Sequence, residues 1–269
     1  MNTASTRAPA TSAGSPLLEV KGATKRFGAV TALRAVNLSL QKHEVVALLG
    51  DNGAGKSTLI RCLSGVHQLD QGQILINGLP ISPRTPAEAQ QLGIVTVHQD
   101  LALFDNLSAA GNFFAGRELS WPRWAGPFGF LNSRAMNVEA EAALRKLQVI
   151  IHDVRHEVGL MSGGQRQGIA VARAESTCRL IMILDEPTAA LGLRERRNVW
   201  TSVERLRSGG ASIILICHNL DEVFAIADRA VVFRQGRNVG EAPANPQYRE
   251  QIVSMIIGAE EPAATARGE

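Results

Sequence analysis

The segment EVVALLGDNGAGKSTLIRCLSG, residues Glu44–Gly65, joins an apolar run to a glycine-rich loop and then to a helical pattern. Its central part, GDNGAGKST, fits the pattern G-x-x-x-x-G-K-[ST] of a phosphate-binding loop. Glycines let the backbone wrap closely round phosphates, and the start of the following helix adds partial positive charge. Lys56 is placed to reach the β and γ phosphates, and Ser57 to ligate Mg²⁺. The expected nucleotide contacts are Gly50, Asp51, Asn52, Gly53, Ala54, Gly55, Lys56, Ser57 and Thr58.

Length and composition describe an ordinary globular protein of one or two domains, with 269 residues, 45% hydrophobic and 20% charged. The net charge of +3 is too small to favour nucleic acid as a partner. Cys62, Cys178 and Cys217 lie far apart, which predicts neither a disulfide framework nor a zinc site and fits a reducing compartment. His152 and His156 have the spacing of zinc ligands on a helix, but without a third ligand we expect solvated histidines.

The longest apolar runs, VVALL and IILIC among them, have the length of strands. They fall short of the roughly 18 residues needed to span a bilayer, so we expect that the chain does not cross a membrane by itself. Residues 1–16 lack the apolar core of a secretion signal and are expected to form a flexible tail, as are residues 259–269.

Strand-like and helix-like segments alternate from Leu17 onward, which is typical of an α/β fold. Five apolar segments are expected as core strands: 44–50, 93–99, 179–186, 211–218 and 229–236. LLEVKGATKRF and AVNLSLQK alternate apolar and polar residues and predict a small antiparallel sheet. NSRAMNVEAEAALRKLQV predicts a helix, capped by Asn132 or Ser133, within a helical insert over about 106–175. SWPRWAGPFGF before it is either a partner surface or a locally packed loop.

Two carboxylates, Asp185 and Glu186, end the apolar strand in LIMILDEPT. An acid at a strand's carboxyl end can hold Mg²⁺ through its water shell, and its neighbour can orient and polarise an attacking water. Structural carboxylates are common at such positions. With a phosphate loop upstream, we interpret this pair as catalytic.

His218 in ILICHNLDEV and Gln99 in VTVHQDLALFDNLS end two further predicted strands. A lone His or Gln at a strand end is usually a structural hydrogen-bonding group. Strands of an α/β sheet deliver residues to the ligand crevice at their carboxyl ends, so we expect both side chains to contact the γ-phosphate, or Mg²⁺ and water.

LMSGGQRQGIAVAR, residues Leu160–Arg173, sets a serine and two glycines directly before a helical run. A helix start with free backbone N–H groups and a hydroxyl can bind an anion.

In this order, Phe27, GDNGAGKST, Gln99, MSGGQ, ILDEP and His218 resemble the ATP-binding subunit of ABC transporters over roughly residues 17–258. The resemblance implies a P-loop NTPase (RecA-like) core sheet with helices on both faces, an N-terminal antiparallel β subdomain and the helical insert. Phe27 would stack on adenine, Gln99 would sense Mg²⁺ and the membrane partner, and His218 would be a switch. The signature turn, defined here as Ser162, Gly163, Gly164 and Gln165, would bind the γ-phosphate of ATP held by a second, head-to-tail subunit.

Motifs such as GDNGAGKSTLIRCLSGV and DEPTAALG look most like bacterial importers of monosaccharides of the ribose, xylose and fructose type. By that resemblance the chain would hydrolyse Mg·ATP on the cytoplasmic face of the bacterial inner membrane, with Lys56, Gln99, Glu186 and His218 as catalytic residues. Its Mg²⁺ ligands would be Ser57, Gln99 and, through water, Asp185. A second copy, a multi-span permease and, indirectly, a periplasmic sugar-binding protein would be its partners, and those membrane and periplasmic proteins would select the sugar.

Two departures from the family pattern stand out. Met161 replaces the usual leucine, a change that conserves volume. Gly192 stands where many members carry an aspartate that contacts the other subunit, although the sugar-importer branch shares this sequence. Pairing with a different ATPase subunit, transport of another solute, an exporter, and a soluble ABC ATPase acting on ribosomes or DNA remain as alternatives.

Overall fold

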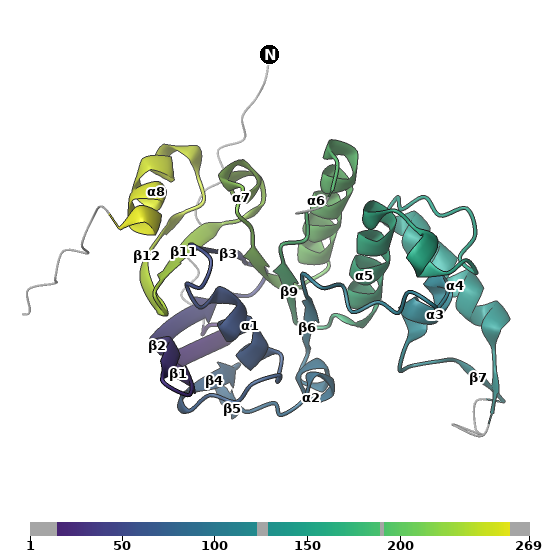
Figure 1. The fold of residues 1–269 in the computed structure, drawn as a ribbon, viewed down its shortest axis with the longest axis horizontal. Coiled ribbons are helices and arrows are strands. Elements are labelled where there is room, and N and C mark those ends of the chain that lie inside the picture. The colour runs from purple at the N-terminus through teal and green to yellow at the C-terminus, as the bar shows by residue number, and fades with distance from the viewer. Residues whose placement is uncertain (1–14, 123–128, 189–190, 259–269) are drawn as a thin grey trace, which may run out of the picture. The chain divides into compact units, whose positions relative to one another are not determined.

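A computed structural model describes residues 15–122, 129–188 and 191–258 (Figure 1). The tails expected at 1–16 and 259–269 lie outside the described residues, apart from Ser15 and Pro16. The chain divides into two compact units. The first comprises the residues up to Ala89 and from Ser212 onward, and the second spans Gln90–Ala211.

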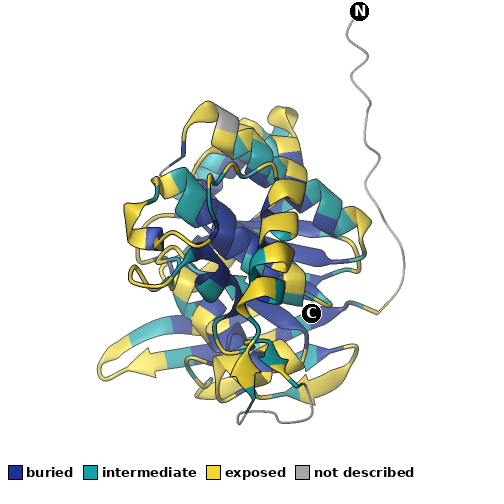
Figure 2. Ribbon diagram, turned by 90° about the vertical axis from the view of Figure 1, so that its right-hand side faces the viewer, coloured by how far each residue is buried: buried dark blue, intermediate teal, exposed yellow. Residues whose placement is uncertain are grey.

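The sheet of the first unit is built around β3 (Val45–Leu49), all of whose residues are buried. β3 pairs in parallel with β10 (Ser212–Ile216) and with β11 (Arg229–Arg234), and β12 (Arg237–Pro243) adds an antiparallel edge. Continuous apolar sequences such as VVALL and SIILI suit strands covered on both faces. Buried residues, dark blue in Figure 2, accordingly concentrate on the strands. The core strands predicted from 44–50, 211–218 and 229–236 are confirmed.

A second sheet of the first unit has the order β2 (Val30–Leu40), β1 (Leu18–Phe27), β4 (Gln71–Ile76) and β5 (Leu79–Ile81). All of its pairings are antiparallel, as the alternating sequence predicted. The remaining elements outside the second unit are α1 (Lys56–Leu63), α7 (Leu220–Ile226), η3 (Pro246–Tyr248) and α8 (Arg249–Ile257), while α2 (Pro86–Gln91) spans the sequence boundary at Ala89.

The second unit pairs β6 (Ile94–Val97) in parallel with β9 (Ile181–Asp185), which confirms two more predicted strands. Its helical elements are α3 (Ala109–Phe114), α4 (Ser133–Lys146), η2 (Val158–Leu160), α5 (Gly163–Thr177) and α6 (Leu193–Ser208). None of the helices that the structure describes is long and apolar enough to cross a bilayer.

Helices α3, α4 and α5 enclose a core of their own, which includes Phe113, Met136, Leu144 and Ile169. The sequence left Asn132 and Ser133 as alternative caps of α4. Asn132 is the cap, because its side chain accepts a hydrogen bond from the Ala135 backbone.

The aromatic segment before α4 forms a short hairpin of β7 (Ser120–Trp121) and β8 (Phe130–Leu131), where a loop was expected. Trp121 and Phe130 face each other in register and are both exposed. Residues 123–128 of this segment lie outside the described part of the chain.

Asn112 on α3 is fully buried and holds the loop that precedes the helix. Its Oδ1 accepts from the Phe104 backbone at 2.7 Å, and its Nδ2 donates to the carbonyls of Phe104, Leu107 and Ser108 at 2.9–3.2 Å. The carbonyls of Phe104, Leu107 and Ser108 also accept backbone hydrogen bonds, from Leu107, Val158 and Asn112 respectively, so the Asn112 amide adds a second bond to each. The Asn112 amide therefore reinforces a loop that backbone hydrogen bonds also hold.

Asn112→Ala should lower the free energy of unfolding by about 2–3 kcal/mol, since it removes the hydrogen bonds of a fully buried amide, including the acceptor of the Phe104 N–H. Urea denaturation followed by circular dichroism measures the change. Asn137→Ala, on the partly exposed side of α4, is the matched control and should cost less than about 0.5 kcal/mol. Equal losses for the two variants would contradict the role given to Asn112.

Candidate functional site

The phosphate loop connects β3 to α1 in the first unit, and its backbone permits only glycine at two positions. Gly50 has a φ of 135°, and an added Cβ would lie 2.1 Å from the Phe233 carbonyl oxygen. Gly55 has a φ of 106°, with the Ala32 carbonyl oxygen 2.8 Å from such a Cβ. The loop can therefore turn sharply while it lies against neighbouring backbone.

Lys56 is buried at the start of α1, and its ammonium points back into the loop. Nζ donates to the carbonyl oxygens of Gly50 at 2.7 Å and of Asp51 at 3.0 Å. Asp51, Asn52 and Gly53 are exposed at the tip of the loop. A positive charge held inside a loop at a helix start is suited to bind a polyphosphate.

His218 follows β10 and is exposed. Ile216 of β10 pairs with Leu48 of β3, so His218 and Gly50 each stand two residues beyond paired positions on neighbouring parallel strands. The first unit thus brings His218 and the phosphate loop to the same edge of its sheet. This is where an α/β sheet binds its ligand.

Phe27 ends β1 with 44% of its surface exposed, and two residues that the sequence did not point to hold its ring. His67 meets it edge to face with ring centroids 5.0 Å apart, and the Lys25 ammonium lies 5.6 Å from its centroid. Lys25 also pairs with Asp70 at 2.9 Å, and this hydrogen bond lowers the pKa of the Asp70 carboxyl below its usual range. The arrangement fixes the ring and leaves part of it open for stacking.

In the second unit, parallel pairing brings Gln99 and the two carboxylates to the same edge of a strand pair. Val97 of β6 pairs with Leu184 of β9, so Gln99 and Glu186 both lie two residues beyond this pair. Asp185 is buried at the end of β9, whereas Gln99 is exposed. Glu186 has a φ of 51°, a conformation that non-glycine residues rarely adopt and that is concentrated at functional sites.

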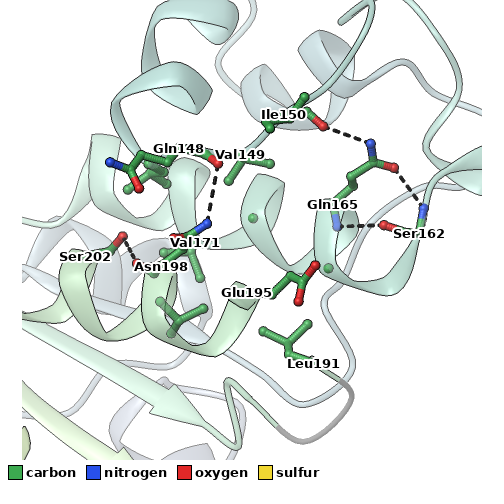
Figure 3. Close-up of a pocket in the computed structure, with 14 residues that line it drawn as sticks. Gln148, Val149, Ile150, Ser162, Gln165, Val171, Leu191, Glu195, Asn198 and Ser202 are labelled. Atoms are coloured by element: carbon green, nitrogen blue, oxygen red, sulfur yellow. Dashed lines mark hydrogen bonds between the residues drawn. The ribbon is translucent and has the colours of Figure 1, made fainter. Parts of the chain in front are cut away.

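The signature turn forms the start of α5 (Figure 3). Ser162 Oγ accepts from the Gln165 backbone at 3.3 Å, while the Ser162 backbone donates to Gln165 Oε1 at 3.0 Å. Gln165 Nε2 also donates to the Ile150 carbonyl at 2.9 Å. This capping box fixes the turn, and Ser162 and Gly163 remain exposed. The serine hydroxyl thus has a structural role in addition to the expected one.

The segment leading into the signature turn is joined to the loop that follows Gln99. The Gly159 backbone donates to the Asp105 carbonyl at 2.9 Å, and the Asp105 carboxylate pairs with Arg166 of α5 at 2.7 Å. Arg173 of α5 donates to the carbonyl of Ala102 at 3.0 Å. Sequence reasoning missed these contacts, because nothing in the spacing of Asp105 and Arg166 marks them as partners.

The residues expected to bind Mg²⁺ offer the oxygen donors that this ion prefers. Ser57 is an exposed hydroxyl in the first turn of α1, in the first unit, while Asp185 and Gln99 belong to the second unit. The chemistry of this donor set fits the ion. His152 and His156, in contrast, are both exposed, as expected of solvated histidines.

Known proteins resemble this chain along most of its length. The family model described as ABC transporter matches residues 33–189. A fructose import ATP-binding protein of Rhizobium meliloti is 43% identical over 253 residues, which cover 93% of this chain and 97% of that protein. A xylose/arabinose import ATP-binding protein of Sulfolobus acidocaldarius is 42% identical over 90% of this chain and 94% of its own length. The crystal structure of a nucleotide-free ATP-binding cassette from an ABC transporter is 24% identical, with a TM-score of 0.75 over 90% of this chain and 98% of that one.

Gly50→Ala should destabilise the protein by clearly more than Gly53→Ala. Both positions have a positive φ, which costs an alanine about 1–2 kcal/mol. Only at Gly50 does the new methyl group also overlap backbone, since a Cβ at Gly53 has no neighbour within 4 Å. Thermal unfolding of both variants measures the difference. Equal midpoints would show that the close approach to Phe233 is not a constraint.

The Cys62 thiol should react slowly with maleimide in the folded protein at pH 8. It is 1% exposed, and burial raises its pKa to about 11, so the reactive thiolate is scarce until the pH approaches that value. Peptide mapping after labelling gives the rate at this position. The rate should rise strongly in urea, and a folded protein that labels as fast as the unfolded one would contradict this.

Proposed function

The chain belongs to the ABC transporter family as an ATP-binding and ATP-hydrolysing subunit, and we propose that it powers the import of a small sugar through a membrane permease. The assignment to transport is supported by the family. The assignment to a sugar is supported by the names of the two relatives, which import fructose and xylose or arabinose. The observation that carries the mechanism is that the phosphate loop and the signature turn both present exposed residues at a helix start. Two such surfaces on two copies can enclose one nucleotide.

The reaction is the attack of water on the γ-phosphorus of ATP. A new P–O bond forms as the bond to the leaving ADP oxygen breaks, with the two oxygens in line. Glu186 orients the water and accepts its proton, and Lys56 offsets the charge on the β and γ phosphates. Ser57, Asp185 and Gln99 would hold Mg²⁺, which when bound neutralises phosphate charge. His218 acts as the polar contact to the γ-phosphate from the edge of the β3 sheet.

The second copy supplies what one phosphate loop leaves open. Ser162, Gly163 and Gly164 of one subunit would bind the γ-phosphate held by Lys56 of the other. ATP then joins the subunits, and hydrolysis releases them. This cycle gives the permease an ATP-driven change between two states.

The place of this subunit is at the cytoplasmic face of a bacterial inner membrane, bound to a multi-span permease that a periplasmic binding protein supplies with sugar. We assign residues 17–258 to the ATPase domain, with a helical subdomain over about 106–175. The exposed Trp121 and Phe130 are candidates for contact with the permease. Copurification of the membrane complex, followed by transport assays with monosaccharides, tests the assignment, and failure to recover any permease would contradict it.

Glu186→Gln should bind ATP normally, lose hydrolysis by a factor on the order of 100 or more, and accumulate as an ATP-bound dimer. The amide keeps the shape of the side chain but cannot accept the proton from water. Light scattering with and without Mg·ATP measures the dimer. Glu139→Gln, at an exposed position of α4, is the control and should behave as the unmodified chain.

Ser162→Arg should abolish hydrolysis while nucleotide still binds to the same chain. The bulky cation would fill the space that the partner's phosphate needs, whereas Lys56 is untouched. Fluorescent-nucleotide binding and phosphate release, measured side by side, separate the two effects. If hydrolysis persisted, the signature turn would have only the structural role seen in its capping box.

A further inference from the structure

Glu195 lies where the starts of two helices approach each other within the second unit. α5 begins at Gly163 with the signature turn, and α6 begins at Leu193, after the segment that follows Glu186. Glu195 stands in the first turn of α6, and an added Cβ on Gly164 would come within 2.9 Å of its Cγ. Figure 3 shows its side chain pointing toward the turn that bears Ser162. The two helix starts are thus in contact through one side chain.

The carboxylate of Glu195 is exposed and has no ion pair or hydrogen bond among the residues that the structure describes. Its Oε2 would be 2.7 Å from a Cβ on Gly192, the residue that precedes α6. α5 has no acidic residue in its own first turn. The positive ends of the α5 and α6 dipoles therefore share this single negative charge.

We propose that Glu195 is a positioning residue that pins the signature turn to the segment following Glu186. The side chain fits between Gly164 and Gly192, and its charge attracts both helix starts. The inference rests on the proposed function, in which the signature turn meets the partner's ATP while Glu186 acts on the chain's own ATP. Glu195 then links one hydrolysis site to the other.

The same geometry accounts for a glycine at position 192, where the family pattern described above has an aspartate. Gly192 has a φ of −72° and a ψ of 171°, which any residue can adopt, and Asp is a favoured residue at such an N-cap. The backbone therefore does not require glycine. A side chain at position 192 would instead point at the place that the Glu195 carboxylate occupies. The space between the two helix starts therefore holds one carboxylate, which either residue 192 or residue 195 can supply.

The role of Glu195 is tested by moving the carboxylate from position 195 to position 192. Glu195→Ala should lower kcat for Mg·ATP hydrolysis about three- to tenfold and reduce the Hill coefficient for ATP. Adding Gly192→Asp to this variant should restore most of the lost turnover. Adding Gly192→Asn should not, although Asn caps a helix as well as Asp does. In the unmodified chain, Gly192→Asp should lower turnover, since it places two carboxylates side by side.

Glu195→Gln keeps the size of the side chain and removes only its charge, so its kcat should also fall while its thermal midpoint stays close to that of the unmodified chain. Glu139→Gln is the matched control on another exposed helix position. The Hill coefficient and the split between KM and kcat are the readouts that a purely local helix cap would leave unchanged.

Rescue by Asp and not by Asn supports the pin. Equal rescue by both would mean that Glu195 only caps α6, and it would overturn the proposal, as would failure of Asp to rescue or unchanged kinetics of Glu195→Ala. An unmodified chain that neither hydrolyses ATP nor binds it would overturn the proposed function itself. If the unmodified chain hydrolyses ATP and the Glu195 variants have the same kcat and Hill coefficient, only the inference about Glu195 would be overturned.

Discussion

The close approach of Gly50 to the Phe233 carbonyl is the constraint on which the nucleotide site depends. β3 runs buried between β10 and β11, and the chain must leave it through a turn that no other residue can make. That turn directs the Gly50 carbonyl toward the Lys56 ammonium, and it starts α1 directly beneath the loop. One backbone contact thus fixes both the charge and the helix start to which we assign phosphate binding.

In the second unit, a pair of parallel strands and a capped helix position the proposed site residues. β6 and β9 end together, which brings Gln99 and Glu186 to the same edge of the strand pair, and Glu186, the proposed base, has a positive φ. The signature turn is rigid because its capping box leaves little freedom to Ser162 and Gln165. The signature turn is therefore shaped by its own hydrogen bonds, with no ligand present.

The sequence predicted what depends on local pattern. Continuous apolar runs identified the five core strands, alternation identified the antiparallel sheet, and the fold class is confirmed. The contacts made across long sequence separations escaped prediction. Asn112 looks like any helix residue, and His67 carries no sign that its ring meets Phe27. The hairpin at Trp121 was expected as a loop, because Pro and Gly nearby argue against strands.

The glycine at position 192 departs from the family's sequence pattern, and the physical reason is visible only in the structure. From the sequence it is a missing carboxylate, whereas the structure finds the Glu195 carboxylate at the same place. Glu195 stands about one helical turn after Gly192 in the sequence. A substitution within a motif can therefore be judged only together with the side chains that surround it.

The central claim is that each hydrolysis site is shared between two copies, and mixing two inactive variants tests it most directly. Lys56→Ala removes the phosphate contact and keeps the signature turn, while Ser162→Arg does the reverse. A mixed dimer would contain one intact site. The account predicts that the mixture hydrolyses Mg·ATP although neither variant does so alone, and a mixture no more active than the sum of its separate components would contradict it.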